Sequence, residues 1–142
     1  MIISYQTNLQ NIDAEYLEGF FVGWPKSPNS QKLWKILDNS QFKIIATINL
    51  EDKPKVVGFV AGLSDKVLTV YISLLEVLPP FQKMGIGRIL MSKMLELTKD
   101  FYMIDLVCDQ DLTSFYQKFG MKKQIAMSKR NYNAQNGQNS IE

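Results

Sequence analysis

The chain has 142 residues, of which 46% are hydrophobic, and it carries a formal net charge of only +2. This length suits one domain around one core, and so small a charge gives no argument for nucleic-acid binding. Histidine is absent, which excludes Ser-His and Cys-His nucleophilic pairs and Cys/His zinc sites. The single cysteine, Cys108, leaves no internal disulfide. Because the N-terminus lacks the features of a secretory leader and no apolar run reaches membrane-spanning length, we expect a cytoplasmic protein without a membrane partner.

The first third of the chain predicts a strand, a helix, a loop and a second helix. The strand is expected over Ile2–Tyr5. Aromatic and aliphatic residues recur at helical spacing over Asp13–Phe21, with Asp13 as a candidate N-cap. Glycine and proline make residues 23–28 a loop. Helical spacing returns over Ser30–Leu37.

The middle of the chain is rich in apolar runs typical of strands. Two of them, Phe42–Asn49 and Val56–Leu63, flank a turn at residues 51–54, and a third covers Val67–Val77. The remaining predicted elements are a helix over Gly85–Lys99, a mostly apolar and therefore central strand over Tyr102–Cys108, a short helix over Leu112–Phe119 and a last strand over Met121–Lys129. The domain is expected to span residues 1–130, followed by a polar tail over 131–142 that is partly disordered.

A glycine-containing loop joins the third apolar strand to the helix that follows it. Residues 82–87 read Gln-Lys-Met-Gly-Ile-Gly. The free N–H groups at such a junction and the positive end of the helix dipole converge on one point, which is typical of a phosphate site. Gly85 and Gly87 let the backbone approach the ligand closely. The loop lacks the Gly-Lys-Ser/Thr of a Walker loop, and Leu90 stands where a dinucleotide fingerprint has its third glycine.

Two motifs resemble those of the GNAT superfamily of acyl-CoA-dependent N-acyltransferases. Gln82, Gly85 and Gly87 match its Arg/Gln-x-x-Gly-x-Gly/Ala signature. Further along, Phe115–Met121 is similar to the family's Phe-Tyr-x-Lys-x-Gly-Phe segment, and the resemblance covers about residues 43–128. It implies an α/β (α+β) domain with a mixed, mainly antiparallel sheet, helices on both faces and splayed central strands that bind CoA. It also implies metal-free transfer of an acetyl group from acetyl-CoA to a primary amine by direct attack. A non-catalytic acyl-CoA-binding or regulatory module is the alternative.

The resemblance places the coenzyme against the strand end and the loop. Backbone groups near Leu75 and Val77 would bind the pantetheine and polarise the thioester carbonyl, although both side chains also suit a core. Lys83 and Arg88 could add charge near the pyrophosphate, with a solvated loop charge as the alternative for Lys83. Asp109 would organise the turn before the short helix. The expected coenzyme-binding set is Leu75, Val77, Gln82, Lys83, Met84, Gly85, Ile86, Gly87, Arg88, Asp109 and Tyr116.

Four residues are candidates for proton transfer. Tyr116 matches the family tyrosine that protonates the departing thiolate of CoA, with simple packing as the alternative. Many family members place a glutamate four residues before the position of Val77, where this chain has Ser73. Tyr71 and Ser73 would share a side with Leu75 and Val77 and could hold a water wire, provided that no bulge intervenes. Glu76 is the rival base, although it faces the opposite side unless a bulge redirects it.

The acceptor side is expected in the first third of the chain, which forms one wall of the acceptor pocket in this family. Phe21, Trp24 and Trp34 are the candidate substrate-binding residues, suited to an amine of apolar or cationic character. Closure of the core is the alternative for Phe20 and Trp34, whereas Trp24 lies in the loop. The acceptor is a small-molecule or peptide amine: a metabolite, an aminoglycoside-like drug, a polyamine, or a protein N-terminus or lysine. A homodimer is compatible with the sequence.

Overall fold

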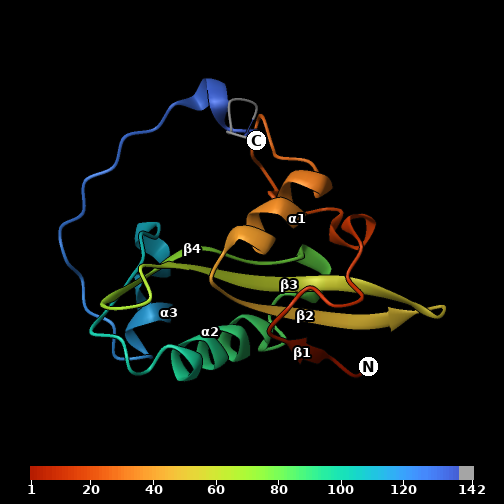
Figure 1. Ribbon diagram of the computed structural model, residues 1–142, viewed down its shortest axis with the longest axis horizontal. Helices are drawn as coiled ribbons and strands as arrows, with labels where there is room; N and C mark the ends of the chain where they lie inside the picture. Colours follow the sequence, from red (N-terminus) through yellow and green to blue (C-terminus); the bar gives the residue numbers. More distant parts are fainter. Residues whose placement is uncertain (138–142) are drawn as a thin grey trace.

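The computed structural model describes residues 1–137 and is built around one five-stranded sheet (Figure 1). The strands are β1 (Ser4–Gln6), β2 (Phe42–Leu50), β3 (Lys53–Ser64), β4 (Thr69–Val77) and β5 (Met103–Asp105). They lie side by side in chain order. The first four are antiparallel to their neighbours and β5 runs parallel to β4. The prediction of a mixed, mainly antiparallel sheet in an α/β domain is confirmed.

In the part of the chain that the structure describes, three α-helices and four short 3₁₀ turns accompany the strands. The helices are α1 (Ser30–Asn39), α2 (Ile86–Leu97) and α3 (Thr113–Gln117). The 3₁₀ turns are η1 (Ala14–Leu17), η2 (Pro79–Phe81), η3 (Gln110–Leu112) and η4 (Tyr132–Ala134). The helix α1 begins where the Asn29 side chain accepts a hydrogen bond from Lys32 N at 2.8 Å. Within residues 1–137, no helix combines the length and the apolar character needed to cross a bilayer.

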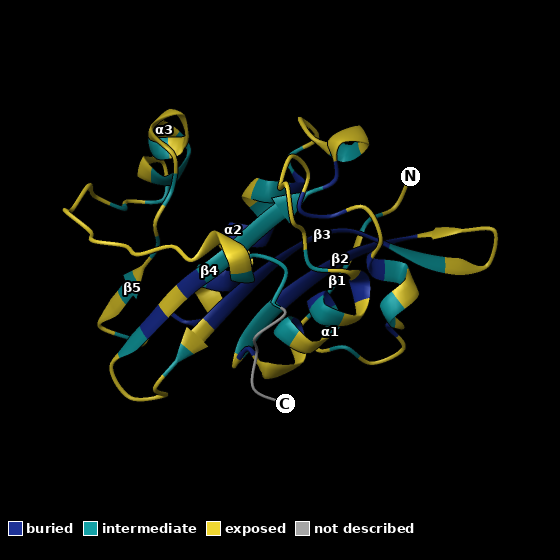
Figure 2. Ribbon diagram, turned by 90° about the horizontal axis from the view of Figure 1, so that it is seen from above, coloured by how far each residue is buried: buried dark blue, intermediate teal, exposed yellow. Residues whose placement is uncertain are grey.

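The central strands β2 and β3 are buried on both faces along most of their length (Figure 2). One face packs against α1 and η1 through residues such as Leu37, Ile45 and Phe59. The other packs against α2 through residues such as Ile44 and Leu90. Successive strand residues point to opposite faces, so burial of both faces explains why β2 and β3 read as nearly continuous apolar runs. We call these two cores the α1-side core and the α2-side core.

The predicted helix over Asp13–Phe21 is wrong. Only Ala14–Leu17 is helical, as a 3₁₀ turn, and the Asp13 side chain makes no cap hydrogen bond. Gly19 and Phe21 adopt left-handed backbone angles, with φ of 96° and 63°. These angles stop a right-handed helix, although the side-chain spacing alone favoured one.

The C-terminal third differs most from the prediction. Of the strand expected over Tyr102–Cys108, only Met103–Asp105 forms, and it lies at the edge of the described sheet rather than at its centre. The strand expected over Met121–Lys129 is not formed: residues 121–131, which we call the C-terminal arm, have no regular structure and loop from α3 to the neighbourhood of α1 (Figure 1). Beyond the arm, Lys26 N donates to Gln135 Oε1 at 2.9 Å and Lys32 Nζ to Gly137 O at 2.7 Å. The disorder predicted for the end of the tail concerns residues 138–142, which lie outside the described residues.

Candidate active site

The strands β4 and β5 diverge beside the loop of residues 82–87, which we call the glycine loop. Their pairing runs from Thr69 opposite Met103 to Tyr71 opposite Asp105, whereas β4 continues to Val77. The last six residues of β4 therefore have no ladder partner on the β5 side among the described residues. Apart from Val77 O, which accepts a hydrogen bond from Gln82 Nε2, their outward backbone groups are available to bind an extended ligand as an added strand would.

A bulge interrupts β4 at Ser73. Ala61 pairs with Leu74 while Gly62 pairs with Ile72, so Ser73 has no opposite residue on β3. As a result, both Ile72 and Leu75 pack in the α2-side core, which strict alternation would not allow for residues three apart. Ser73 is therefore the point where β4 changes phase. The common side proposed for Tyr71, Ser73, Leu75 and Val77 required an unbroken strand, and the bulge removes that condition.

The loop between β4 and α2 has the geometry of an anion site. Lys83 and Gly85 have φ of 63° and 84°, and Gly85 is the N-cap residue of α2. The first helical hydrogen bond runs from Ile89 N to Gly85 O at 3.0 Å, so the amides of residues 86–88 precede the first possible intrahelical donor. The Gln82 side chain does not join them, because its Nε2 donates to Val77 O at 2.9 Å. Gln82 thus ties the loop to the end of β4.

Side chains around the two glycines define the walls of this loop. A Cβ placed on Gly85 would lie 3.6 Å from Arg88 Nη2, so the Arg88 guanidinium is folded back over the loop. A Cβ on Gly87 would lie 3.8 Å from Val77 Cγ2 and 3.9 Å from Phe115 Cζ. The end of β4 and α3 therefore meet at Gly87. Among the other predicted contacts, Ile86 is buried, so only its backbone faces the loop, whereas Lys83 and Met84 are exposed.

Phe115 connects the motif at residues 115–121 to the glycine loop, because its ring lies beside Gly87. Its ring centroid lies 5.0 Å from that of Tyr116 and 5.4 Å from that of Phe119, both edge-on. Tyr116 is half-buried, and burial, with a smaller contribution from the charge of the nearby Cys108, raises the pKa of its phenol to about 12. The phenol is therefore a neutral proton donor at physiological pH. Asp109 precedes η3, but its side chain makes no cap hydrogen bond.

The Glu76 carboxylate binds the loop at Phe21, in the part of the chain where the acceptor is expected. Phe21 N donates to both Glu76 carboxylate oxygens at 2.9 Å, and Val22 N lies 3.4 Å from Oε2. This carboxylate thus holds the backbone at Phe21, whose φ is 63°. We call this contact the Glu76 clasp. The sequence contained one signal for it, a carboxylate within an apolar run, but no indication of its partner 55 residues away.

The three aromatic candidates of the acceptor side lie in different surroundings. Phe21 is buried in the α1-side core and lines a cavity of about 340 Å³ formed by residues 17–21, 27–31 and 33. Trp34 packs against the same core, and its Nε1 donates to Ile12 O at 2.8 Å. Trp24 is 41% exposed, with its ring centroid 4.8 Å from that of Phe21. Trp24 is therefore the candidate that stands free to meet a ligand.

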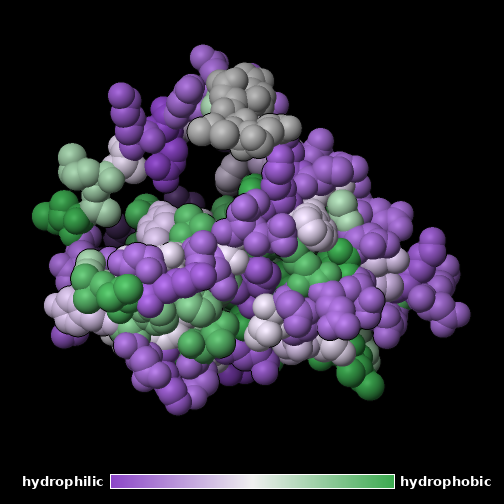
Figure 3. Space-filling view, in the orientation of Figure 1, coloured by the Kyte–Doolittle hydropathy of each residue, from purple (hydrophilic) through white to green (hydrophobic). Residues whose placement is uncertain are grey.

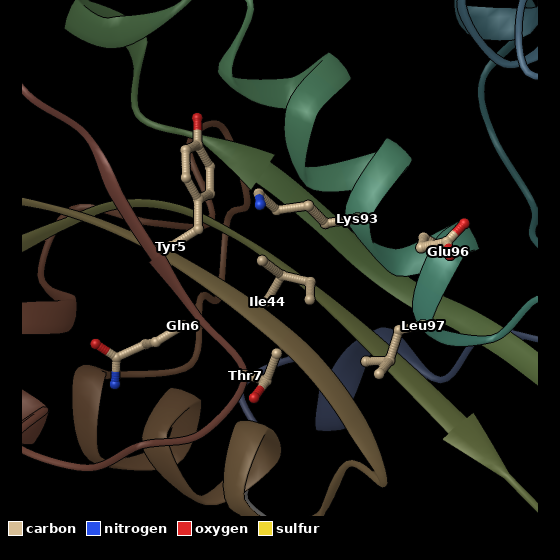
Figure 4. A pocket seen from close by; sticks show the side chains of 7 residues that line it. All are labelled: Tyr5, Gln6, Thr7, Ile44, Lys93, Glu96 and Leu97. Atoms are coloured by element: carbon tan, nitrogen blue, oxygen red, sulfur yellow. The ribbon is translucent and has the colours of Figure 1, made fainter.

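A second cavity, of about 250 Å³, lies on the other side of the sheet (Figure 4). It is bounded by β1 and the C-terminal half of α2, and Lys93 Nζ lies 5.3 Å from the centroid of the Tyr5 ring. None of its lining residues belongs to the glycine loop or the end of β4, so it is separate from the site described above. No group of three or more Cys, Asp or Glu side chains within residues 1–137 is placed to hold a metal ion.

Comparisons with known proteins agree with this geometry. The model of the acetyltransferase (GNAT) family matches residues 9–121. The uncharacterized N-acetyltransferase ycf52 of Porphyra purpurea is 32% identical over 124 residues, covering 84% of this chain and 70% of that protein. GCN5-related N-acetyltransferase 3, chloroplastic, of Arabidopsis thaliana is 37% identical over 68 residues, covering 46% of this chain and 29% of its own length. The crystal structure of a candidate acetyltransferase from Deinococcus radiodurans R1 superposes with a TM-score of 0.88 at 40% identity, covering 94% of this chain and 92% of the other. The resemblance seen in the sequence is thus confirmed, and this chain is an acetyltransferase that belongs to the GNAT family.

Proposed function

We propose that this protein transfers an acetyl group from acetyl-CoA to a primary amine by direct attack. The observation that carries the proposal is the meeting of two features at one point: the divergence of β4 from β5, and the glycine loop that caps α2. A pantetheine chain needs an extended groove with free backbone groups, and a pyrophosphate needs converging amides. Both lie at the same end of β4, and α3 adjoins them at Gly87.

In this scheme the glycine loop binds the pyrophosphate of the coenzyme, and β4 activates the thioester. The amides of residues 86–88 and the Arg88 guanidinium hold the pyrophosphate of acetyl-CoA, and the free edge of β4 holds the pantetheine. A backbone N–H near Leu75 or Val77 donates to the thioester oxygen, a contribution of about a few kcal/mol for one good donor. The amine nitrogen attacks the carbonyl carbon, the new C–N bond forms, and the C–S bond breaks with its electron pair on sulfur.

Tyr116 meets the charge that develops on sulfur. A phenol with a pKa of about 12 remains protonated when a thiolate, whose usual pKa is about 8.5, is released. Tyr116 therefore stabilises the thiolate leaving group by donating a hydrogen bond to sulfur, and it keeps its own proton. The proton lost by the amine leaves through water, for which the hydroxyl of Ser73 at the bulge is the remaining candidate on β4, because Tyr71 no longer shares a side with Leu75 and Val77. Glu76 is the less suitable base, because both of its oxygens accept hydrogen bonds from Phe21 N.

Trp24 is our candidate for contact with the acceptor, because an exposed indole suits an apolar or cationic amine. Phe21 and Trp34 support the wall behind it from the α1-side core. We propose the cytoplasm as the compartment, from the sequence alone. The alternative, a non-catalytic coenzyme-binding module, draws its support from Ser73 at a position where many family members carry a glutamate.

The test is release of CoA thiol from acetyl-CoA in the presence of a panel of amines. The panel contains a polyamine, an aminoglycoside, small metabolite amines, and peptides with a free N-terminus or lysine. Gly87→Glu places bulk and negative charge in the loop, whereas Gly87→Ala is a matched control whose Cβ makes only ordinary contacts of 3.8 and 3.9 Å. We expect turnover with at least one amine, loss of turnover and coenzyme binding in Gly87→Glu, and retention of both in Gly87→Ala. Coenzyme binding without turnover on any amine establishes the alternative, and unchanged affinity in a folded Gly87→Glu variant removes the phosphate site.

A further inference from the structure

The C-terminal arm is an extended segment without a partner. Ile125 is 96% exposed and Met127 is 93% exposed. No hydrogen bond joins residues 121–130 to another described residue. Met121, Ile125 and Met127 are at odd-numbered positions and would share one face of a strand, a face that Lys123 interrupts. Such a segment exposes apolar surface and unpaired backbone groups at the same time, which folded proteins avoid.

The strand β5 offers a complementary surface in the same chain. It pairs with β4 along one edge and is the last strand of the described sheet, so its other edge is open. Charge favours the pairing as well. Residues 121–131 contain three lysines and one arginine and no acidic residue, whereas residues 100–111 contain four aspartates and no basic residue. Strand addition would therefore join a basic strand to an acidic edge.

The arm is held away from the β5 of its own chain. At one end it leaves α3, and beyond its other end Gln135 and Gly137 are fixed to the backbone of Lys26 and the side chain of Lys32 by hydrogen bonds of 2.9 and 2.7 Å. Between these anchors it arches clear of the sheet, and Figure 3 shows it standing off the body of the molecule. A strand and an edge that fit each other, but do not meet within one chain, can both be satisfied by a twofold exchange between two chains.

We propose that the partner of this surface is a second copy of the same chain: the arm of each copy adds to the free edge of β5 in the other. The exchange completes both sheets and covers Ile125 and Met127. It would also buttress α3, which lies between β5 and the arm in the chain and carries Tyr116. The proposal does not depend on the identity of the acceptor or on turnover, so its test uses no activity measurement.

The first experiment measures the mass of the full chain by sedimentation equilibrium at tens of micromolar. We expect a species of twice the chain mass of 16.3 kDa. Ile125→Pro removes a backbone donor and should yield a monomer, whereas Ile125→Val keeps a β-branched strand residue and should leave the dimer intact. Because Ile125 is 96% exposed in the single chain, neither variant should unfold the domain, which a thermal melt verifies.

The second experiment identifies the contact. Wild-type chain, whose only cysteine is Cys108 three residues after β5, is refolded together with a Met127→Cys, Cys108→Ser variant and treated with a short bismaleimide. A cross-link between residues 108 and 127 can then form only between chains. We expect this cross-linked peptide by mass spectrometry, above the level in either protein alone. A monomeric wild type, a dimer that survives Ile125→Pro, or a dimer that lacks the 108–127 cross-link would each overturn the proposal.

Discussion

Replacing Glu76 tests whether its carboxylate is architectural or catalytic. The clasp consists of one amide, Phe21 N, shared between two oxygens at 2.9 Å, and a longer approach from Val22 N at 3.4 Å. We count this as one strong charge-assisted hydrogen bond, which contributes about 1.5–3 kcal/mol. Phe21 is only 4% exposed, so an alanine at position 76 leaves its amide without a partner. We therefore expect Glu76→Ala to lower the free energy of unfolding by about 2–3 kcal/mol, and Glu76→Gln, which keeps an acceptor oxygen, by about 1 kcal/mol.

The assay combines urea unfolding, followed by tryptophan fluorescence, with steady-state kinetics at saturating acetyl-CoA. Glu96→Gln is the matched control, since Glu96 is an exposed glutamate that pairs with Lys99 at 3.0 Å and such surface pairs contribute little. If the clasp positions the acceptor loop, Glu76→Gln should raise the KM for the amine several-fold and lower kcat by less than tenfold. Coenzyme affinity should stay unchanged, because the Glu76 side chain bonds to Phe21 N and Val22 N, whereas the side chain of β4 beside Gly87 is that of Val77.

The opposite pattern would refute this reasoning. If Glu76→Gln is as stable as the wild type and as Glu96→Gln, yet loses a factor of about a hundred or more in kcat at unchanged KM, the carboxylate acts on a proton in the transition state. The main role of Glu76 would then be that of a general base. The hydrogen bonds of the Glu76 clasp would not stabilise the fold, and the loop that carries Phe21 would be held by its core contacts alone.

Three further substitutions probe the rest of the site. Tyr116→Phe should lower kcat and kcat/KM alike by about a hundredfold while coenzyme affinity is retained, and activity within twofold of wild type would make Tyr116 a packing residue. Because burial raises the pKa of Tyr116 to about 12 from an unfolded value near 10, the stability linked to its proton is complete below about pH 10 and lost up to about pH 12. Thermal melts should therefore fall less steeply over that interval for Tyr116→Phe than for the wild type. Trp24→Ala should raise the KM for the amine at nearly unchanged stability, whereas a large loss of stability without a kinetic effect would assign Trp24 to the core. Gly85→Ala should destabilise the fold by about 1 kcal/mol, because φ is +84° there, and equal stability of Gly85→Ala and Gly87→Ala in urea would contradict a left-handed turn at Gly85.

Local patterns in the sequence were enough to predict the scaffold of the site. The apolar runs located β2, β3 and β4, and the glycine loop located the start of α2 to within one residue of Gly85. These elements are determined by burial and by backbone geometry that only certain residues adopt. The loop motif is therefore visible without any knowledge of tertiary contacts.

The errors came from interactions between distant parts of the chain. Side-chain spacing suggested a helix over Asp13–Phe21, but the Glu76 clasp and the left-handed angles at Gly19 and Phe21 set that backbone. The arm carries apolar residues at strand spacing, yet a strand needs a neighbour, and no strand within residues 1–137 pairs with it. No glycine or proline marks the bulge at Ser73. In a strand buried on both faces, an apolar run carries no information about which residue breaks the alternation.

That bulge explains how one strand end contacts both the glycine loop and the loop at Phe21. Ile72 packs in the α2-side core. Had β4 continued from there in strict alternation, Leu74 and Glu76 would also face α2, and Val77 would face α1. A carboxylate would then enter an apolar core, the loop at Phe21 would lose its acceptor, and Val77 could not lie beside Gly87. The single extra residue at Ser73 reverses the phase, so Val77 supports the glycine loop while Glu76 reaches Phe21 on the other face. With or without the bulge, the backbone edge of β4 beyond Tyr71 has no strand partner on the β5 side. The bulge therefore leaves the proposed coenzyme groove intact. It also connects this groove, through Glu76, to the loop at Phe21.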